Sequence, residues 1–166
     1  MAGKKLLLEK VGVKAHYYQE TYGGCGQAVV GAFRSVLGDD IISETVFKSA
    51  TGLSGGCVQT GNVCGAVSGG VLVISLFSGR DESTWDDASR KERTYELGNR
   101  LVDYFMEIYG DINCEGIKNN VVLKNISPES IKISDEGEKE TDCAVICRRA
   151  AKKVMEILIE EGFVKI

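Results

Sequence analysis

The chain has 166 residues, of which 43% are hydrophobic and 27% charged, and its formal net charge is −4. This length predicts one domain that buries about two-thirds of the surface of its unfolded chain. Because the composition has no basic excess, neither nucleic acid nor an anionic membrane surface is an expected partner.

The first third of the chain predicts three helices separated by glycine turns. The apolar run in the leading MAGKKLLLEK is too short for a signal peptide, so a cytoplasmic protein is expected. Periodic apolar residues predict helices at 4–20, 25–37 and 42–50. Gly38 is the expected stop of the second helix, and Ser43 or Asp40 lies near the cap of the third.

The segment 63–78 predicts a buried central helix. Its part VLVISLF is apolar on every side, which is typical of a helix surrounded by neighbours. The run 58–79 carries no charge, but its dense apolar part covers only 71–77. A membrane-spanning helix needs about 20 mainly apolar residues. Membrane insertion is therefore not expected.

The second half of the chain predicts two longer helices. In the first, which ends at Gly110, Ser83 and Asp86 resemble a capping box. Its expected inward stripe is Tyr95, Gly98, Leu101 or Val102, Phe105 and Ile108. The last helix, at about 141–162, has a core-facing stripe of Cys143, Cys147, Ala150, Val154 and Leu158. Between the two helices, 111–140 is the least regular region, with at most a short turn at Cys114.

These segments together predict an all-α fold. We expect a single domain over 1–166, built as a bundle of five to six helices around the buried central helix. No convincing strand ladder is present in the sequence.

The six cysteines are too few for a disulfide-stapled secreted scaffold, so metal binding or redox chemistry is favoured. Four of them are expected at the N-terminal ends of helices or turns: Cys25, Cys64, Cys114 and Cys143. There the helix dipole and free N–H groups favour the thiolate, the form that binds metals and attacks disulfides. Cys57 and Cys147 are interpreted as packing residues.

Glycines beside Cys64 give its helix a smooth face. Gly65 and Gly69 are four residues apart, so a compact inorganic cofactor or the backbone of another helix can approach this face closely. Familiar redox and nucleotide motifs (CxxC, CxxCH, Walker A, GxGxxG) are missing. His16 is the only histidine, which excludes mixed Cys/His zinc sites apart from a Cys₃His one. An all-thiolate site remains, and it suits soft metals and iron–sulfur clusters.

Four segments resemble the family described as "putative redox-active protein" and labelled C_GCAxxG_C_C. They read GGCGQAVVGAF, LSGGCVQTGNVCGAVSGGVLVISL, YGDINCEGI and DCAVICRRAAKKVMEIL. The family has four characteristic cysteines, one of them inside a CGAxxG motif that here reads CGAVSG, from Cys64 to Gly69. By order and context the others match Cys25, Cys114 and Cys143.

The resemblance covers about 18–160 and leaves an extra N-terminal helix outside the family core. It implies that the four matched cysteines form one redox site. A related segment is similar to the iron–sulfur part of split-Soret cytochromes, which implies that such a fold can hold a cluster. The chain departs from the family after Cys114, where EGI replaces an arginine and an apolar residue.

Three functions remain open on the sequence. The leading hypothesis is electron transfer by an iron–sulfur cluster on Cys25, Cys64, Cys114 and Cys143, with Gly65 and Gly69 beside it. The alternatives are a thiol–disulfide oxidoreductase that cycles pairs of these cysteines, and a structural or storage zinc tetrathiolate. An oxygen-labile cluster would be lost from protein handled in air. The sequence does not decide whether the protein is an enzyme, which protein is its redox partner, or whether it forms homo-oligomers.

Overall fold

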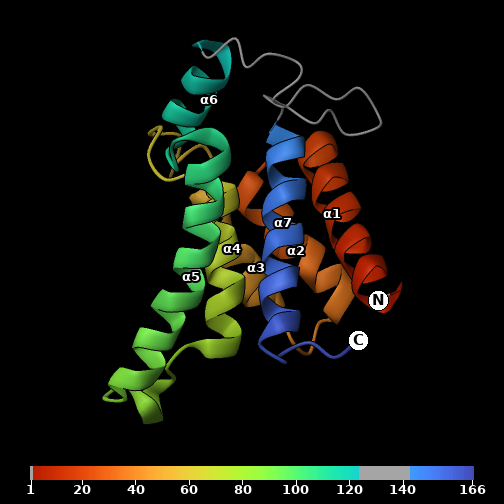
Figure 1. Cartoon of the computed structure of the whole chain (residues 1–166), viewed down its shortest axis with the longest axis vertical. Coiled ribbons are helices and arrows are strands. Elements are labelled where there is room, and N and C mark those ends of the chain that lie inside the picture. The colour runs from red at the N-terminus through yellow and green to blue at the C-terminus, as the bar shows by residue number, and fades with distance from the viewer. Residues whose placement is uncertain (1, 124–142) are drawn as a thin grey trace.

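The computed structural model describes residues 2–123 and 143–166, and the side chains of 121–123 are left out of the description. Within these residues the chain is all-α and has no strand (Figure 1). The helices are α1 (Ala2–Tyr22), α2 (Cys25–Leu37), α3 (Glu44–Ser49), α4 (Gly65–Ser78), α5 (Ala88–Tyr109), α6 (Cys114–Leu123) and α7 (Cys143–Glu160). The all-α prediction is confirmed. The helix beyond the expected five or six is α6, which lies in the region predicted to be least regular.

Helix α4 is the central element of the bundle. It packs against α2, α5 and α7, while α1 covers α2 and α7 from the outside (Figure 1). Its buried residues include Val67, Val73 and Ile74, and Leu76 at 39% exposure marks the one edge that faces solvent. The predicted buried central helix is therefore confirmed, and its apolar composition follows from having neighbours on three sides.

Glycines and a serine set the ends of α2 and α3. Gly24 precedes α2 in the left-handed region, at φ 80°, and Gly38 ends the helix at φ 99°. A residue with a Cβ is strained in such conformations, so these glycines fix the helix boundaries. Ser43 caps α3, because its hydroxyl accepts a hydrogen bond from the Val46 N–H at 3.3 Å.

The predicted start of α5 is wrong. Its cap is Asp87, whose carboxylate accepts from the N–H groups of Ser89 and Arg90. A capping box does form upstream, between Asp81 and Thr84, around a short 3-10 turn (Glu82–Thr84). The expected pair of Ser83 and Asp86 fails because the chain bends between that turn and the longer helix.

The inward stripe of α5 also differs from the prediction at Tyr95 and, near its end, at Ile108, which is half-buried beside the buried Tyr109. Gly98, Leu101 and Phe105 are buried as expected, but Tyr95 is 62% exposed. One helical turn before Gly98 the stripe continues through Thr94, whose hydroxyl lies 3.0 Å from that of Ser78 on α4. In α7 the predicted stripe is confirmed from Cys147 onward, with every member fully buried.

Helices α2 and α4 cross with their backbones in contact. A Cβ at Gly69 would lie 2.8 Å from the carbonyl oxygen of Gly26, and one at Gly65 would lie 3.1 Å from the backbone nitrogen of Gly26. Real Cβ atoms do not approach backbone as closely as 2.8 Å, so the crossing requires glycine at position 69.

Among the described helices, none is both long and apolar enough to cross a membrane.

We predict that Gly69→Ala lowers the free energy of unfolding by about 1–3 kcal/mol, because the new methyl group meets backbone that cannot rotate away. Gly98→Ala is the matched control, since its Cβ would make ordinary contacts of 3.8 and 3.9 Å with Val71. The control should be neutral or more stable by up to about 1 kcal/mol. Urea unfolding of both variants measures the difference, and equal effects would contradict the close crossing.

Candidate functional site

Each of the four predicted site cysteines lies at the beginning of a different helix. Cys25 is the first residue of α2, Cys114 is the first of α6, and Cys143 is the first described residue of α7. Cys64 immediately precedes α4 and caps it, with its carbonyl oxygen accepting from the N–H of Ser68 at 2.9 Å. The expected placement at helix starts is therefore observed for Cys25 and Cys64, and Cys114 begins a full helix rather than a turn.

These cysteines border one small cavity of about 20 Å³ with an apolar wall. Its lining residues are Cys25, Cys64, Cys114, Ile117, Lys118, Cys143 and Ile146. Residues far apart in the sequence thus meet at one place in the bundle. Across the part of the chain that the structure describes, no three His, Cys, Asp or Glu side chains are arranged so that they could hold a metal ion. The four thiols therefore share a cavity without forming a ready-made ion site.

Backbone pairing holds Cys64 and Cys114 next to each other. The Cys64 N–H donates to the carbonyl of Ile112 at 2.8 Å, and the Cys114 N–H donates to that of Asn62 at 2.7 Å. An isolated antiparallel bridge lies between these two hydrogen bonds. The loop before α4 therefore satisfies an N–H at the start of α6, which would otherwise lack a helical partner.

The same turn carries an internal cap. Oδ1 of Asp111 accepts from the N–H groups of Ile112 and Asn113, at 2.7 and 2.8 Å. A Cβ at Gly116 would overlap the Asp111 carboxylate. Gly116 therefore leaves the room that this cap needs, and the cap fixes the chain just before Cys114.

Gly65 and Gly69 have different neighbours. A Cβ at Gly65 would overlap Sγ of Cys25, so glycine here is what lets that thiol reach the start of α4. Gly69 faces the backbone of Gly26. The sequence allowed either a cofactor or the backbone of another helix beside this glycine face of α4. At Gly69 the structure shows a helix backbone. A cofactor-binding role of either glycine stays a prediction.

The environment of Cys64 opposes its ionisation. The pKa of the Cys64 thiol is raised to about 12, mainly by burial. The N–H groups of Ala66 and Val67 act to lower this pKa, and the nearby thiols of Cys25 and Cys114 act to raise it. The expectation that a helix start favours the thiolate is therefore wrong for Cys64 in the metal-free protein. Desolvation outweighs the helix dipole here, although a bound cation reverses that balance.

Cys147 is fully buried, as expected for a packing residue. Its thiol lies 3.7 Å from the carbonyl oxygen of Cys25 and 3.9 Å from Oε1 of Gln19, and it donates to both. Cys147 therefore packs directly behind the first turn of α2, outside the cavity.

The packing interpretation is wrong for Cys57, which is exposed. The chain is left-handed from Gly55 to Gln59, and Cys57 itself has φ 63°. This loop closes on itself through the N–H of Gly61, which donates to the carbonyl of Gly55 at 3.0 Å. The reversed backbone turns its side chains outward, and such strain in non-glycine residues is costly.

Cys114 connects the cavity to the outside. Together with Lys118 it lines both the cysteine cavity and an outer cleft of about 540 Å³. Polar side chains, among them Thr60 and Asn119, line the rest of this cleft. Cys114 and Cys143 are partly exposed whereas Cys25 and Cys64 are buried, and Cys114 is the thiol through which the site meets this cleft.

The sequence did not reveal Ile117, Lys118 and Ile146 as lining residues of the cavity. The signal was available, because each lies three or four residues after a site cysteine and therefore on the same helical face. For Ile117 and Lys118 it was missed because α6 was predicted only as a short turn.

We predict that iodoacetamide at pH 8 modifies the exposed Cys57 first, and the partly exposed Cys114 and Cys143 next, in the metal-free protein. Cys64 should react at least about 100-fold more slowly than Cys57, because it is buried and its raised pKa leaves little thiolate. Peptide mass spectrometry over time gives the order, and protein unfolded in urea is the control in which the rates converge. Equal rates at Cys57 and Cys64 in folded protein would contradict this environment.

Comparison with known families agrees with the geometry. The model of the family described as "Putative redox-active protein (C_GCAxxG_C_C)" matches residues 24–157, which include all four cysteines of the cavity. Neither curated proteins nor solved structures give a match. Because the match extends over more than half of the chain, this protein belongs to the C_GCAxxG_C_C family.

Proposed function

We propose that the protein binds an iron–sulfur cluster through Cys25, Cys64, Cys114 and Cys143 and transfers electrons. The observation that carries the proposal is the meeting of these four thiols, from the starts of four helices, on one apolar cavity. An all-sulfur donor set suits iron–sulfur clusters. When bound, the cluster supplies one-electron chemistry, and the protein supplies the ligands and their surroundings.

The surrounding residues support this use of the thiols. The N–H groups of Ala66 and Val67 point at the Cys64 sulfur, and hydrogen bonds to ligating sulfur tune a redox potential. Ile117 and Ile146 keep part of the wall apolar and so limit water access. Lys118 places a cationic side chain at the boundary of the site, where a cation offsets the negative charge of thiolates.

Ligand binding requires the side chains to adjust. Since no three of the donors form a ready-made ion site, rotation of thiols about χ1 must accompany binding. Proton release must accompany it as well, because only thiolates ligate and burial keeps the Cys64 thiol protonated in the metal-free protein.

A thiol–disulfide oxidoreductase is the second candidate. It is favoured by the proximity of Cys25 and Cys114 to Cys64, whose pKa both thiols raise. The same raised pKa makes Cys64 a poor attacking thiol, so Cys114 would have to attack. We rank this function below cluster binding for that reason. A zinc site would use the same four thiolates and is separated from the cluster by metal analysis.

We predict that protein reconstituted without oxygen contains iron and acid-labile sulfide and absorbs visible light. Replacing Cys25, Cys64, Cys114 or Cys143 singly by serine should remove most of the iron and sulfide, because each supplies one ligand. Cys57→Ser is the matched control and should keep the full content, since this thiol is exposed on the outer loop. Iron, sulfide and zinc assays on all five variants measure the effect.

Colourless protein without iron after anaerobic reconstitution would contradict the cluster proposal. One zinc per chain, lost in each of the four variants, would then identify the tetrathiolate. Reversible loss of two or four thiols on mild oxidation, without bound metal, would identify the oxidoreductase.

A further inference from the structure

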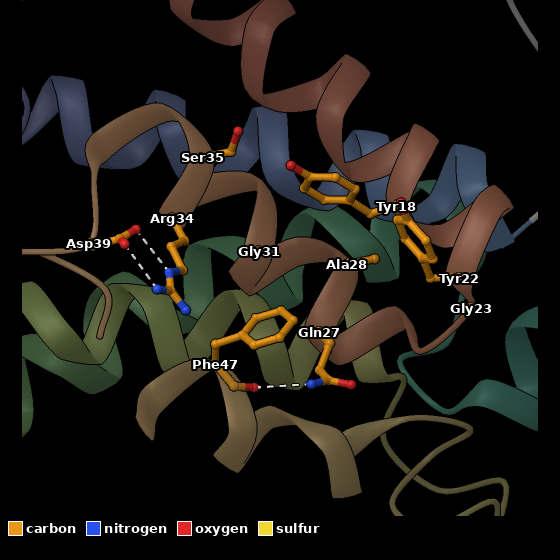
Figure 2. A pocket seen from close by; sticks show the side chains of 10 residues that line it. All are labelled: Tyr18, Tyr22, Gly23, Gln27, Ala28, Gly31, Arg34, Ser35, Asp39 and Phe47. Atoms are coloured by element: carbon orange, nitrogen blue, oxygen red, sulfur yellow. Dashed lines mark hydrogen bonds and ion pairs between the residues drawn. The ribbon is translucent and has the colours of Figure 1, made fainter. Parts of the chain in front are cut away.

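A further cavity lies away from both the cysteine site and its outer cleft. It has a volume of about 420 Å³ and shares no lining residue with the cysteine cavity. Its floor is one face of α2, where Gln27, Gly31 and Arg34 recur at helical spacing. Tyr18 and Tyr22 of α1 form one wall and Phe47 of α3 forms the other (Figure 2). We call this cavity the α2 groove.

The middle of the α2 groove is flat and aromatic. Gly31 lies between the rings of Phe47 and Tyr18, because a Cβ there would be 3.1 Å from the first and 3.6 Å from the second (Figure 2). The ring of Tyr22 lies 6.3 Å from that of Tyr18 and remains 74% exposed. A bare glycine floor between aromatic walls suits a planar ring, which gains from stacked or edge contacts with tyrosine and phenylalanine.

The ends of the α2 groove are polar, but their charges cancel. Arg34 binds Asp39 through two hydrogen bonds of 3.0 Å each, which leaves Nη1 of the guanidinium as a donor turned away from Asp39 (Figure 2). At the other end Gln27 donates to the Phe47 carbonyl at 3.3 Å and keeps its own Oε1 as an acceptor. A ligand therefore meets a donor and an acceptor at opposite ends and no unpaired charge among the lining residues.

We propose that the α2 groove binds a neutral, planar, fused heteroaromatic ring with carbonyl and N–H groups at its edge, of the flavin or pterin type. The volume lies in the usual range for small-molecule sites, about 300–1,000 Å³. The floor from Gln27 to Ser35 is about 12 Å long at the helical rise per residue, which accommodates two or three fused rings. The charge-paired Arg34 offers no free cation to a phosphate, so the ring and not an anionic tail is what the groove recognises.

This binding is independent of the cysteine chemistry. Titration of the full-length protein with riboflavin, followed by quenching of riboflavin fluorescence, should show saturable binding. Tyr22→Ala and Phe47→Leu should each weaken it by about three- to tenfold, because each removes one aromatic contact. Tyr95→Ala is the matched control, since this tyrosine is also largely exposed but lies on α5 outside the groove. The affinity of the Tyr95→Ala variant for riboflavin should equal that of the unmodified protein.

Two comparisons keep the proposal falsifiable. FMN should bind no more tightly than riboflavin, because its phosphate finds no partner, and circular dichroism confirms that each variant is folded. Absence of riboflavin and pterin binding up to their solubility limits would overturn the proposal. Unchanged affinity in both groove variants, or FMN binding more than tenfold tighter than riboflavin, would overturn it as well.

Discussion

Helices α2 and α4 can cross as closely as they do only because glycines of α4 face the first turn of α2. Gly69 lies on the backbone of Gly26, and Gly65 lies under the sulfur of Cys25. This contact brings the start of α2 to the start of α4, and with it Cys25 to Cys64. A methyl group at Gly65 or Gly69 would separate the two helices and therefore the two thiols. The close packing of the two helix backbones is therefore a condition for bringing the cysteines of the site together.

Around that crossing, hydrogen bonds rather than apolar packing bring in the third cysteine. The pairing of Asn62 with Cys114 and of Ile112 with Cys64 ties α6 to the loop before α4. The resulting enclosure dehydrates Cys64 and raises the pKa of its thiol. Burial of Cys64 therefore affects its chemistry as a ligand. Burial keeps the thiol protonated, and a bound cation can replace that proton and stabilise the thiolate. Cys114 and Cys143 remain the partly exposed members of the site.

Much of this architecture could be predicted from the sequence because local signals determine it. Gly38 and Ser43 end or begin helices by their own conformational preferences, and the periodic stripe of α7 indicates its buried face. The cysteines were recognisable because each stands beside a glycine turn or a helix start. The failures have tertiary causes. Helix α6 begins where a distant loop supplies its hydrogen bonds, and Cys57 turns outward in a left-handed backbone that no residue pattern indicates. The sequence-based expectation of a thiolate at Cys64 considered the helix dipole and omitted burial. At Cys64 burial has the larger effect on the pKa of the thiol.

The central claim is that four thiols from four helices serve one cluster. Crystals of the anaerobically reconstituted protein, measured with X-rays at the iron absorption edge, test it most directly. The account predicts anomalous density inside the cavity, joined to the sulfur atoms of Cys25, Cys64, Cys114 and Cys143. Iron bound elsewhere on the chain, or a disulfide between two of these cysteines with no anomalous density beside it, would contradict the account.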